Sequence, residues 1–573
     1  MPSMSDSVVA QYSTPMGLIF VFNLIIGTGA LAMPKAFQEA GYVLGLVTIT
    51  VLALMSYVSL TFVVESMSAA NAVLESKRAG KLKKLALQFA SENPASRSAS
   101  HTDLASTARL LSQSNSPRVP SVTRPQFFEI TQRVEFGRMA SMFLNKWGVR
   151  FFYACLIIYL YGDLSIYATA VPKSMMNVVC TYRPPIDGHN GTAPCSTAAN
   201  ITNDEPCWAN IGHFWTRFTI YRLFVVVFAF LIGPWVFFNV SKTKYLQTFS
   251  TASRWIAFIL MISLATVRLI KGEPDIGHPP VIDLRHFGNL FGICVYAFMC
   301  HHSLPSVITP MKSKNHLFPL TALVYTLILS FYVTLSMTGS FAFAGVMDVY
   351  TLNFLHQCNS GGKQDSDSAS THYFLLVVEY FLALFPVFTL SMTFPVVGIT
   401  LRNNIQALLL PHFGRAKKSE DGEGDGKEKT SDLEGTLDPA EVDASTSVDG
   451  SGEENAALIA SGESTWRDRL VKIGHNVGVP CLVLLVPVTV ALASDNVEIL
   501  TSITGSYAGV GVQYVMPSLL VWGVRKRLPL VLGESVPREY GSPFRHVYWV
   551  YLLFTWAGVT VLVVTLNHIF TAL

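Results

Sequence analysis

Runs of apolar residues recur along the 573-residue chain, separated by shorter polar stretches. About eleven of these runs contain roughly 20–25 residues, the length that a helix needs to cross the hydrocarbon layer of a bilayer. Because most runs follow one another closely, they predict an all-α, polytopic membrane protein with about 11 transmembrane helices. The predicted spans cover residues 16–40, 42–66, 149–178, 219–240, 250–271, 287–311, 318–345, 372–400, 470–493, 498–524 and 546–570.

The composition supports this prediction. Half of the residues are hydrophobic and only 14% are charged, against about 25% in an average soluble domain. This composition, with a mean hydropathy of +0.40, argues against a soluble enzyme. The net charge of +3 gives no reason to expect a nucleic-acid partner. The first run lacks a preceding basic segment and a small-residue cleavage site, so we expect it to remain in the membrane rather than to be removed as a signal peptide.

The charged residues gather in two stretches that we expect to be disordered cytosolic linkers. The first is basic and rich in serine, and the second has an excess of acidic residues, so neither can bury an apolar core. Each could be a simple tether; a docking segment controlled by phosphorylation, or a basic segment touching anionic lipid, is the alternative. The predicted organisation is a cytosolic N-terminus (1–15), spans one and two (16–66), a basic linker (67–148), spans three to eight (149–401), an acidic linker (402–468) and spans nine to eleven (469–573).

Lysine and arginine residues place the N-terminus in the cytosol. They are concentrated in the loop after the second span and in later loops on the same side, as the positive-inside rule requires. The large outer loop, residues 179–218, contains glycosylation sequons at Asn190 and Asn200. We expect the protein in the plasma membrane or an endolysosomal membrane. Four outer-loop cysteines are candidates for disulfides, with pairing left open: Cys180, Cys195, Cys207 and Cys358.

Two predicted spans are interrupted near their centres. In the first, residues 27–30 include two glycines and are followed by Pro34, a combination that weakens a helix by roughly 5 kcal/mol. In the sixth, two histidines precede Ser303 and Pro305, where the serine can cap a restarted helix. Breaks five spans apart predict the five-plus-five inverted-repeat core of many secondary transporters, with broken helices 1 and 6. Two ordinary helix kinks are the alternative.

Broken helices expose backbone groups that suit a zwitterion. A restarted half-helix presents unpaired N–H groups to a carboxylate, and the preceding half-helix presents carbonyls to an ammonium group or a cation. We therefore predict an amino-acid-like substrate whose carboxylate lies against residues 27–30 and whose ammonium lies against carbonyls of residues 298–301. The candidate substrate-binding residues are Gly27, Thr28, Gly29, Ala30, Phe298, His301 and Ser303.

Other polar residues at membrane depth are candidates for ion coupling. Outside the histidines of the sixth span, Asp163 is the only deep charged group that we identify. A carboxylate there costs at least about 2.5–3.5 kcal/mol, so it should face the bundle interior. It could relay protons, contact the substrate or form a hydrogen bond between helices. Thr389 and Thr393 share one helical face, where they could hold a small cation or bond to their own helix.

The sequence resembles the amino acid/auxin permease family, which includes the sodium-coupled neutral amino acid transporters. The residues that carry the resemblance are Asn23 with GTGALAMP in the first span, AFMCHHSLPSVI in the sixth and TFPVV in the eighth. A branch called the transmembrane protein 104 family is more similar still, through FNLIIGTGALAMPKAF, FEITQRVEFGRMASMF, YLYGDLSIYA, MCHHSLPSVITP, ITLRNN and SPFRH. This likeness covers nearly all of the predicted spans.

The resemblance implies eleven helices, ten of them in the inverted-repeat core. In the sodium-coupled relatives, an asparagine of the first span and a threonine of the eighth are associated with the sodium site. By motif, these roles would fall on Asn23 and Thr393. Those relatives commonly have His-Pro in the sixth span, where this chain has two adjacent histidines.

These observations predict a secondary transporter of small amino acids or related zwitterions, working by alternating access coupled to Na⁺ or H⁺. The alternatives are a non-transporting amino-acid sensor or scaffold with a transporter-like fold, and a channel or lipid-handling protein. We expect no enzymatic activity and no cofactor. We also expect no metal centre, because no cysteine or carboxylate accompanies the paired histidines at ligand spacing. The expected partners are the small-molecule substrate and the lipid bilayer.

Overall fold

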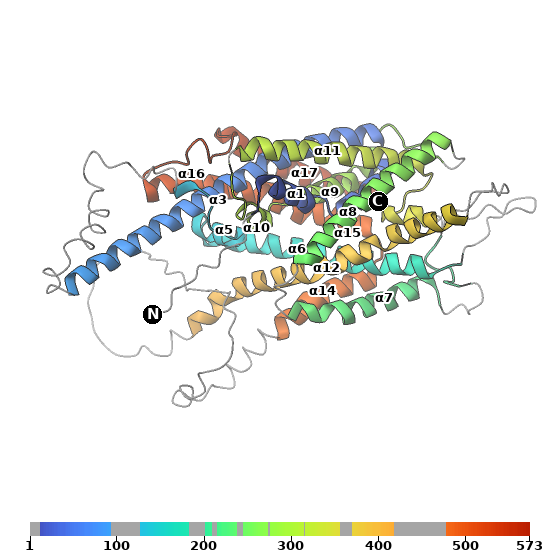
Figure 1. The fold of residues 1–573 in the computed structure, drawn as a ribbon, viewed down its shortest axis with the longest axis horizontal. Helices are drawn as coiled ribbons and strands as arrows, with labels where there is room; N and C mark the ends of the chain where they lie inside the picture. The colour runs from blue at the N-terminus through green and yellow to red at the C-terminus, as the bar shows by residue number, and fades with distance from the viewer. Residues whose placement is uncertain are drawn as a thin grey trace, which may run out of the picture.

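The helices of the computed structural model lie side by side, most of them along the long axis of the molecule (Figure 1). Within the residues that the structure describes, every regular element is a helix, which confirms the predicted all-α class. The described residues are 12–92, 127–182, 201–208, 215–237, 244–272, 276–314, 316–355, 369–416 and 477–572.

Eight helical segments of the described chain are long and apolar enough to cross a bilayer. A ninth span consists of two helices, α1 (Thr14–Ile25) and α2 (Gly29–Ala40), which meet at an angle of 52°. The two other predicted spans contain shorter helices. The ninth is α14 (Val479–Ala493), and the sixth is α9 (Phe287–Ala297) followed by α10 (Leu304–Ile308). The eight long segments are α3 (Tyr42–Glu92), α6 (Lys146–Val179), α7 (Arg217–Ile232) with η5 (Gly233–Phe237), α8 (Lys244–Lys271), α11 (Leu317–Ala342), α12 (Ala369–Ala416), α15 (Val497–Ile503) continuing into α16 (Met516–Leu532), and α17 (Val547–Ala572).

Side-chain caps define where three of these helices begin. The side chain of Asn145 accepts the backbone N–H of Gly148 at the start of α6, and Thr216 caps α7 in the same way. Asn496 accepts the N–H of Ile499 at the start of α15. Each cap satisfies one of the amides that a helix leaves unpaired in its first turn, and is typically worth about 1 kcal/mol.

The most buried spans are α6 and the α15–α16 segment. About 70% of their apolar window is buried, whereas the figure is 28% for α8 and α17. The peripheral helices instead expose large apolar side chains, as expected where a helix faces lipid. Among these exposed side chains are Phe230, Ile270, Leu485 and Phe570. The central helices are therefore the ones that can line a site inside the protein.

The end of α3 differs from the predicted boundary at residue 66. The helix continues to Glu92, and the small residues from Ser66 to Val73 are buried. The Asn71 side chain accepts the backbone N–H groups of Thr131 and Gln132, which holds the returning chain and α5 (Phe136–Phe143) against the bundle. The prediction that residues 67–148 form a disordered linker is therefore wrong at both ends of this range. Small polar residues give a segment the low hydropathy of a linker, but here they permit close packing of the helix.

The acidic linker also begins later than predicted. The helix α12 continues through Ala416, beyond the predicted end of the span at residue 401. Residues 417–476 lie outside the described part of the chain.

One disulfide is present in the predicted outer loop. It joins Cys180, directly after α6, to Cys207. The other cysteine candidates and both sequons lie outside the described residues; they are Cys195, Cys358, Asn190 and Asn200.

Glycines allow α9 to pack directly on the π-helical turn η9 (Thr504–Gly509). A Cβ atom on Gly505 would lie 1.9 Å from the carbonyl oxygen of Gly292. A Cβ on Gly292 would in turn lie 2.2 Å from the carbonyl oxygen of Ser502. Because both obstacles are backbone atoms, no side chain can rotate away to make room.

We therefore expect Gly505→Ala to destabilise the protein. Overpacking of a close interior contact costs about 1–3 kcal/mol, so the thermal unfolding midpoint in detergent should fall by several degrees. Gly558→Ala on α17 is the matched control, because a Cβ there meets no atom within 4 Å. An equal midpoint for the two variants would contradict the close approach of α9 to η9.

Candidate functional site

The first break, between α1 and α2, leaves backbone amides without acceptors. Around it, Ile26 donates to Phe22, Ala30 to Gly27 and Leu31 to Thr28. Within the described residues, this leaves the N–H groups of Gly27, Thr28 and Gly29 without a backbone acceptor. A Cβ on Gly27 would meet no atom within 4 Å, so open space adjoins these amides.

The second break, between α9 and α10, offers carbonyls. The helix restarts after Ser303 with Pro305 in its first turn, although the Ser303 side chain makes no capping bond. The carbonyls of Met299 and His301 accept no hydrogen bond from the described residues. Phe298 is fully buried, and its carbonyl accepts the hydroxyl of Ser56 on α3 at 3.4 Å, so this carbonyl already has a partner.

The two breaks lie against each other. The hydroxyl of Thr28 is 3.0 Å from the hydroxyl of Tyr296 on α9, and a Cβ on Gly29 would lie 2.7 Å from the Cα of Ala297. Tyr332 on α11 donates to carbonyls on both sides, 3.1 Å from that of Ile25 and 3.0 Å from that of Ala297. We call residues 26–28 and 298–303 the paired breaks. These contacts place Thr28 and Gly29 against the last turn of α9, directly before the second break.

Asp163 lies on α6 and is connected to the paired breaks by a tyrosine. The Tyr296 hydroxyl donates to its carboxylate and also contacts Thr28, so Tyr296 links α6, α9 and α2. Tyr167 lies one turn beyond Asp163 on the same face of α6. The side chain of Asp163 is buried, as predicted from the cost of a carboxylate at this depth. The sequence did not single out Tyr296, because a tyrosine in an apolar run looks like an ordinary core residue.

The adjacent histidines of the second break occupy different surroundings. The Nε2 atom of His301 is 2.8 Å from the Ser59 hydroxyl of α3, and its Nδ1 atom is buried without a partner. The ring of His302 packs 5.5 Å from the ring of Tyr159. Among the described residues, no group of three histidine, cysteine or acidic side chains could hold a metal ion. His301 therefore attaches α10 to α3 and does not belong to a cluster of ligands.

The threonines of the predicted ion site bond to their own helix. On α12, Thr389 donates to the carbonyl of Phe385 at 2.9 Å, and Thr393 donates to the carbonyl of Thr389 at 2.8 Å. The sequence allowed two interpretations of these threonines, a cation site or bonds to their own helix, and the structure has the bonds to their own helix. Both atoms of the Asn23 side-chain amide, by contrast, are buried without a partner.

Arg254 is a second charged residue at the first break, so the prediction that Asp163 is the only deep charge apart from the histidines is wrong. Its Nη1 atom donates to the carbonyl of Asn23 at 2.6 Å and to that of Ile26 at 2.5 Å. The residue lies near the start of a predicted span, and an arginine there is expected to extend toward the membrane surface. The packing of α8 against α1, through stacking of Trp255 on Phe22, directs it inward instead.

Ion pairs close the end of the bundle that carries the disulfide. Lys35 on α2 is 2.9 Å from Glu498 on α15, and Lys173 on α6 is 2.7 Å from Asp348. A polar cavity of about 300 Å³ lies beside them and also reaches Asp495. The Lys35–Glu498 pair ties the half of the first span that follows the break to the tenth span.

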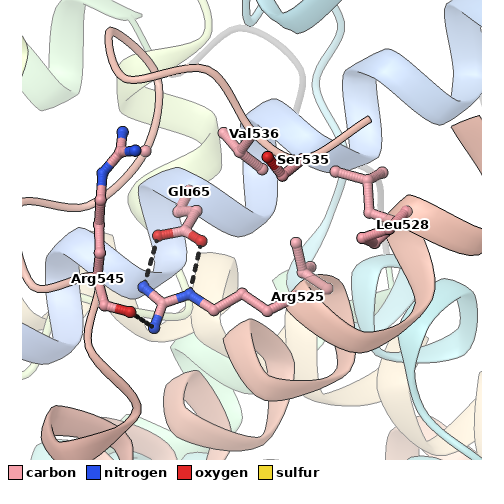
Figure 2. A pocket seen from close by; sticks show the side chains of 9 residues that line it. Glu65, Arg525, Leu528, Ser535, Val536 and Arg545 are labelled. Atoms are coloured by element: carbon pink, nitrogen blue, oxygen red, sulfur yellow. Dashed lines mark hydrogen bonds and ion pairs between the residues drawn. The ribbon is translucent and has the colours of Figure 1, made fainter. Parts of the chain in front are cut away.

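A buried ion pair joins helices at the opposite end. Figure 2 shows the Glu65 carboxylate of α3 facing the Arg525 guanidinium of α16, with two bonds of 2.9 Å between them. Arg525 also donates to the carbonyl of Arg545, and the N–H of Ser542 donates to Glu65. A cavity of about 150 Å³ adjoins this pair. Both ends of the bundle are therefore closed by charge pairs that involve the tenth span.

A helical membrane protein with paired broken helices at its centre and ion pairs at both ends has the architecture of a secondary transporter. Sequence comparison gives the family. The sequence pattern of the family described as "Transmembrane amino acid transporter protein" matches residues 10–90 and 129–528, so the chain belongs to that family.

Full-length relatives agree with this assignment. The chain is 42% identical to human transmembrane protein 104 over 565 residues, which is 97% of each protein. It is 40% identical over 572 residues to the transmembrane protein 104 homolog of Caenorhabditis elegans, 99% of each, and 30% identical over 576 residues to that of Dictyostelium discoideum, 98% of each. The predicted relationship to both families is confirmed.

Replacing Arg525 by alanine should destabilise the protein, because Glu65 would remain buried without its partner. Breaking a buried pair costs about 3–5 kcal/mol, and the partial exposure of Arg525 places the expected loss at the lower end. The measurement is the thermal unfolding midpoint in detergent. Lys526→Ala removes an exposed neighbouring cation and should leave the midpoint nearly unchanged. Equal midpoints for both variants would show that the pair does not hold this end together.

Proposed function

We propose that the protein is a secondary transporter of amino acids or similar small zwitterions. The observation that carries the proposal is that the break with free amides at residues 27–29 packs, through Thr28 and Gly29, against the last turn of α9, directly before the free carbonyls of Met299 and His301. Amides at a helix start favour a carboxylate, and carbonyls favour an ammonium group. The open space beside Gly27 allows a ligand to approach these amides.

Membership in the transmembrane amino acid transporter family supports the same substrate class. The buried amide of Asn23 and the hydroxyl of Thr28 border the first break and supply further polar contacts for a ligand. In this proposal Ala30 and Gly29 contribute backbone and close packing, and Phe298 and Ser303 shape the second break.

Alternating access requires that the two ends of the bundle open in turn. The Lys35–Glu498 pair would separate to open the disulfide end, and the Glu65–Arg525 pair would separate to open the other. Each pair joins a buried carboxylate to a partly exposed cation, so an end can open only if water reaches the carboxylate when the partners part. The positive-inside pattern assigns the second end to the cytosol.

For the coupling ion, the sequence left Na⁺ and H⁺ as candidates, and we propose H⁺ with Asp163 as its acceptor. Asp163 is connected through Tyr296 to Thr28 at the first break. A carboxylate at this position can change charge while the substrate binds at the break, two hydrogen bonds away through Tyr296, which is the relation that coupling needs.

Uptake of radiolabelled amino acids into proteoliposomes tests the proposed function. We expect uptake above that of protein-free liposomes, and at least a tenfold loss in Gly27→Val, whose side chain would fill the open space beside the amides. Gly27 does not have a left-handed backbone, so the variant should fold. Gly558→Val is the control for a lipid-facing glycine.

The outcomes separate the candidate functions. A thermal shift on addition of amino acids without uptake would support the alternative of a non-transporting sensor. Neither uptake nor a thermal shift would contradict a zwitterion site altogether, and full uptake by Gly27→Val would contradict its location.

The role of Asp163 predicts a change in pH dependence. Asp163→Asn should give uptake that no longer responds to a pH gradient, because the amide cannot take up or release the proton. Asp204→Asn, in the loop next to Cys207, is the matched control and should keep the wild-type response. The measurement is initial uptake rate against external pH, and a wild-type profile in Asp163→Asn would rule out the relay.

A further inference from the structure

The carbonyls at the end of α1 are where a coupling cation would bind, and a side chain already occupies them. A helix leaves its last carbonyls unpaired, with a partial negative charge that attracts cations. Here the Nη1 atom of Arg254 lies 2.6 Å from the carbonyl oxygen of Asn23 and 2.5 Å from that of Ile26. Of the two carbonyls between them, that of Ile25 accepts the hydroxyl of Tyr332 at 3.1 Å.

A sodium ion at this place would need the oxygens that Arg254 holds. The other expected ligands, Thr389 and Thr393, donate their hydroxyl protons to carbonyls of their own helix, which leaves lone pairs on both oxygens, so the obstacle to a cation is the occupation of the α1 carbonyls by Arg254. A guanidinium keeps its positive charge in proteins, so it also repels a second cation at the same oxygens. The residues present therefore do not fit a sodium site.

The surroundings of Arg254 hold it in this position. On the next residue, the ring of Trp255 stacks on Phe22 of α1, with ring centroids 4.5 Å apart. Tyr332 of α11 donates to the neighbouring carbonyl of Ile25, so α11 also contacts the end of α1 that Arg254 binds. The guanidinium thus belongs to the packing of α8 against the broken end of α1.

We propose that Arg254 is a built-in cation that takes the place of a coupling sodium ion, so that the protein does not bind Na⁺ at the end of α1. This inference deepens the proposed transport function, and its consequence for coupling rests on that function. The binding statement itself does not, because it concerns occupancy of a site in the folded protein.

A sodium titration of the purified protein tests the proposal without requiring transport. Thermal unfolding is followed from 0 to 200 mM NaCl, with choline chloride keeping the ionic strength constant. Wild type should show no saturable stabilisation by Na⁺. Arg254→Ala frees both carbonyls and should be stabilised saturably by Na⁺; at a hundred times its Kd, a ligand shifts the folding equilibrium by about a hundredfold.

Two further variants make the test specific. Arg254→Lys keeps a positive charge at the site and should remain insensitive to Na⁺, whereas Arg254→Gln removes the charge and should respond as alanine does. Arg222→Ala is the matched control, since Arg222 also donates to a backbone carbonyl, that of Leu492, but far from the break in sequence. If Arg254→Ala does not fold, the contrast between lysine and glutamine carries the same information.

The outcomes are distinct from those for transport. Saturable stabilisation of wild type by Na⁺, or an equal lack of response in all neutral variants that fold, would overturn the built-in cation. Uptake in proteoliposomes should proceed equally in sodium and choline buffers; uptake that requires Na⁺ would also overturn it. Absence of uptake in both buffers would count against the proposed transport function and leave the binding result to stand alone.

Discussion

Every backbone group that leaves a helix at membrane depth needs another partner, and this constraint organises the centre of the molecule. The hydrogen bonds of the helical backbone are interrupted at each of the paired breaks, and the carbonyls and amides on the two sides of the first break differ in their partners. Arg254 and Tyr332 bind the carbonyls of Asn23, Ile25 and Ile26 at the end of α1, while the amides of residues 27–29 have no backbone acceptor among the described residues. The protein thus neutralises the negative end of one half-helix itself and leaves the positive end of the other unpaired.

Tyrosines make this arrangement possible in an otherwise apolar interior. A tyrosine ring packs like any aromatic side chain, and its hydroxyl can donate one hydrogen bond and accept another. Tyr296 uses this to connect Asp163 with Thr28, and Tyr332 connects the carbonyls on both sides of the paired breaks. Asp163 on α6 is therefore joined to the first break through a neutral group, whereas Arg254 on α8 binds the carbonyls there directly. A movement of α1 must break contacts with several helices at once, which favours two discrete arrangements over a continuous one.

The sequence was most informative where the signal is local. Helix-length apolar runs and the glycine and proline residues of the first and sixth spans are read directly from neighbouring positions, and the structure has both breaks where these residues predict them. Partners contributed by other helices were not accessible in this way. Arg254 looked like an arginine near a membrane surface, and Thr393 had two possible partners, between which only the surrounding helices decide. The buried small residues after α3's predicted end were missed for the same reason, since their polarity says nothing about the chain that covers them.

The tenth span has a particular position in this scheme. Its first part, α15, holds Glu498 against Lys35 at the disulfide end, and its last part, α16, holds Arg525 against Glu65 at the other. Between the two lie π-helical turns, where the hydrogen-bond register changes and a helix bends more easily. The contact of Gly505 with Gly292 fixes those turns against α9, directly before the second break. One helix therefore carries an ion pair at each end, a flexible point between them and a contact with the candidate site at that point, so that opening either end must displace an element that touches the paired breaks.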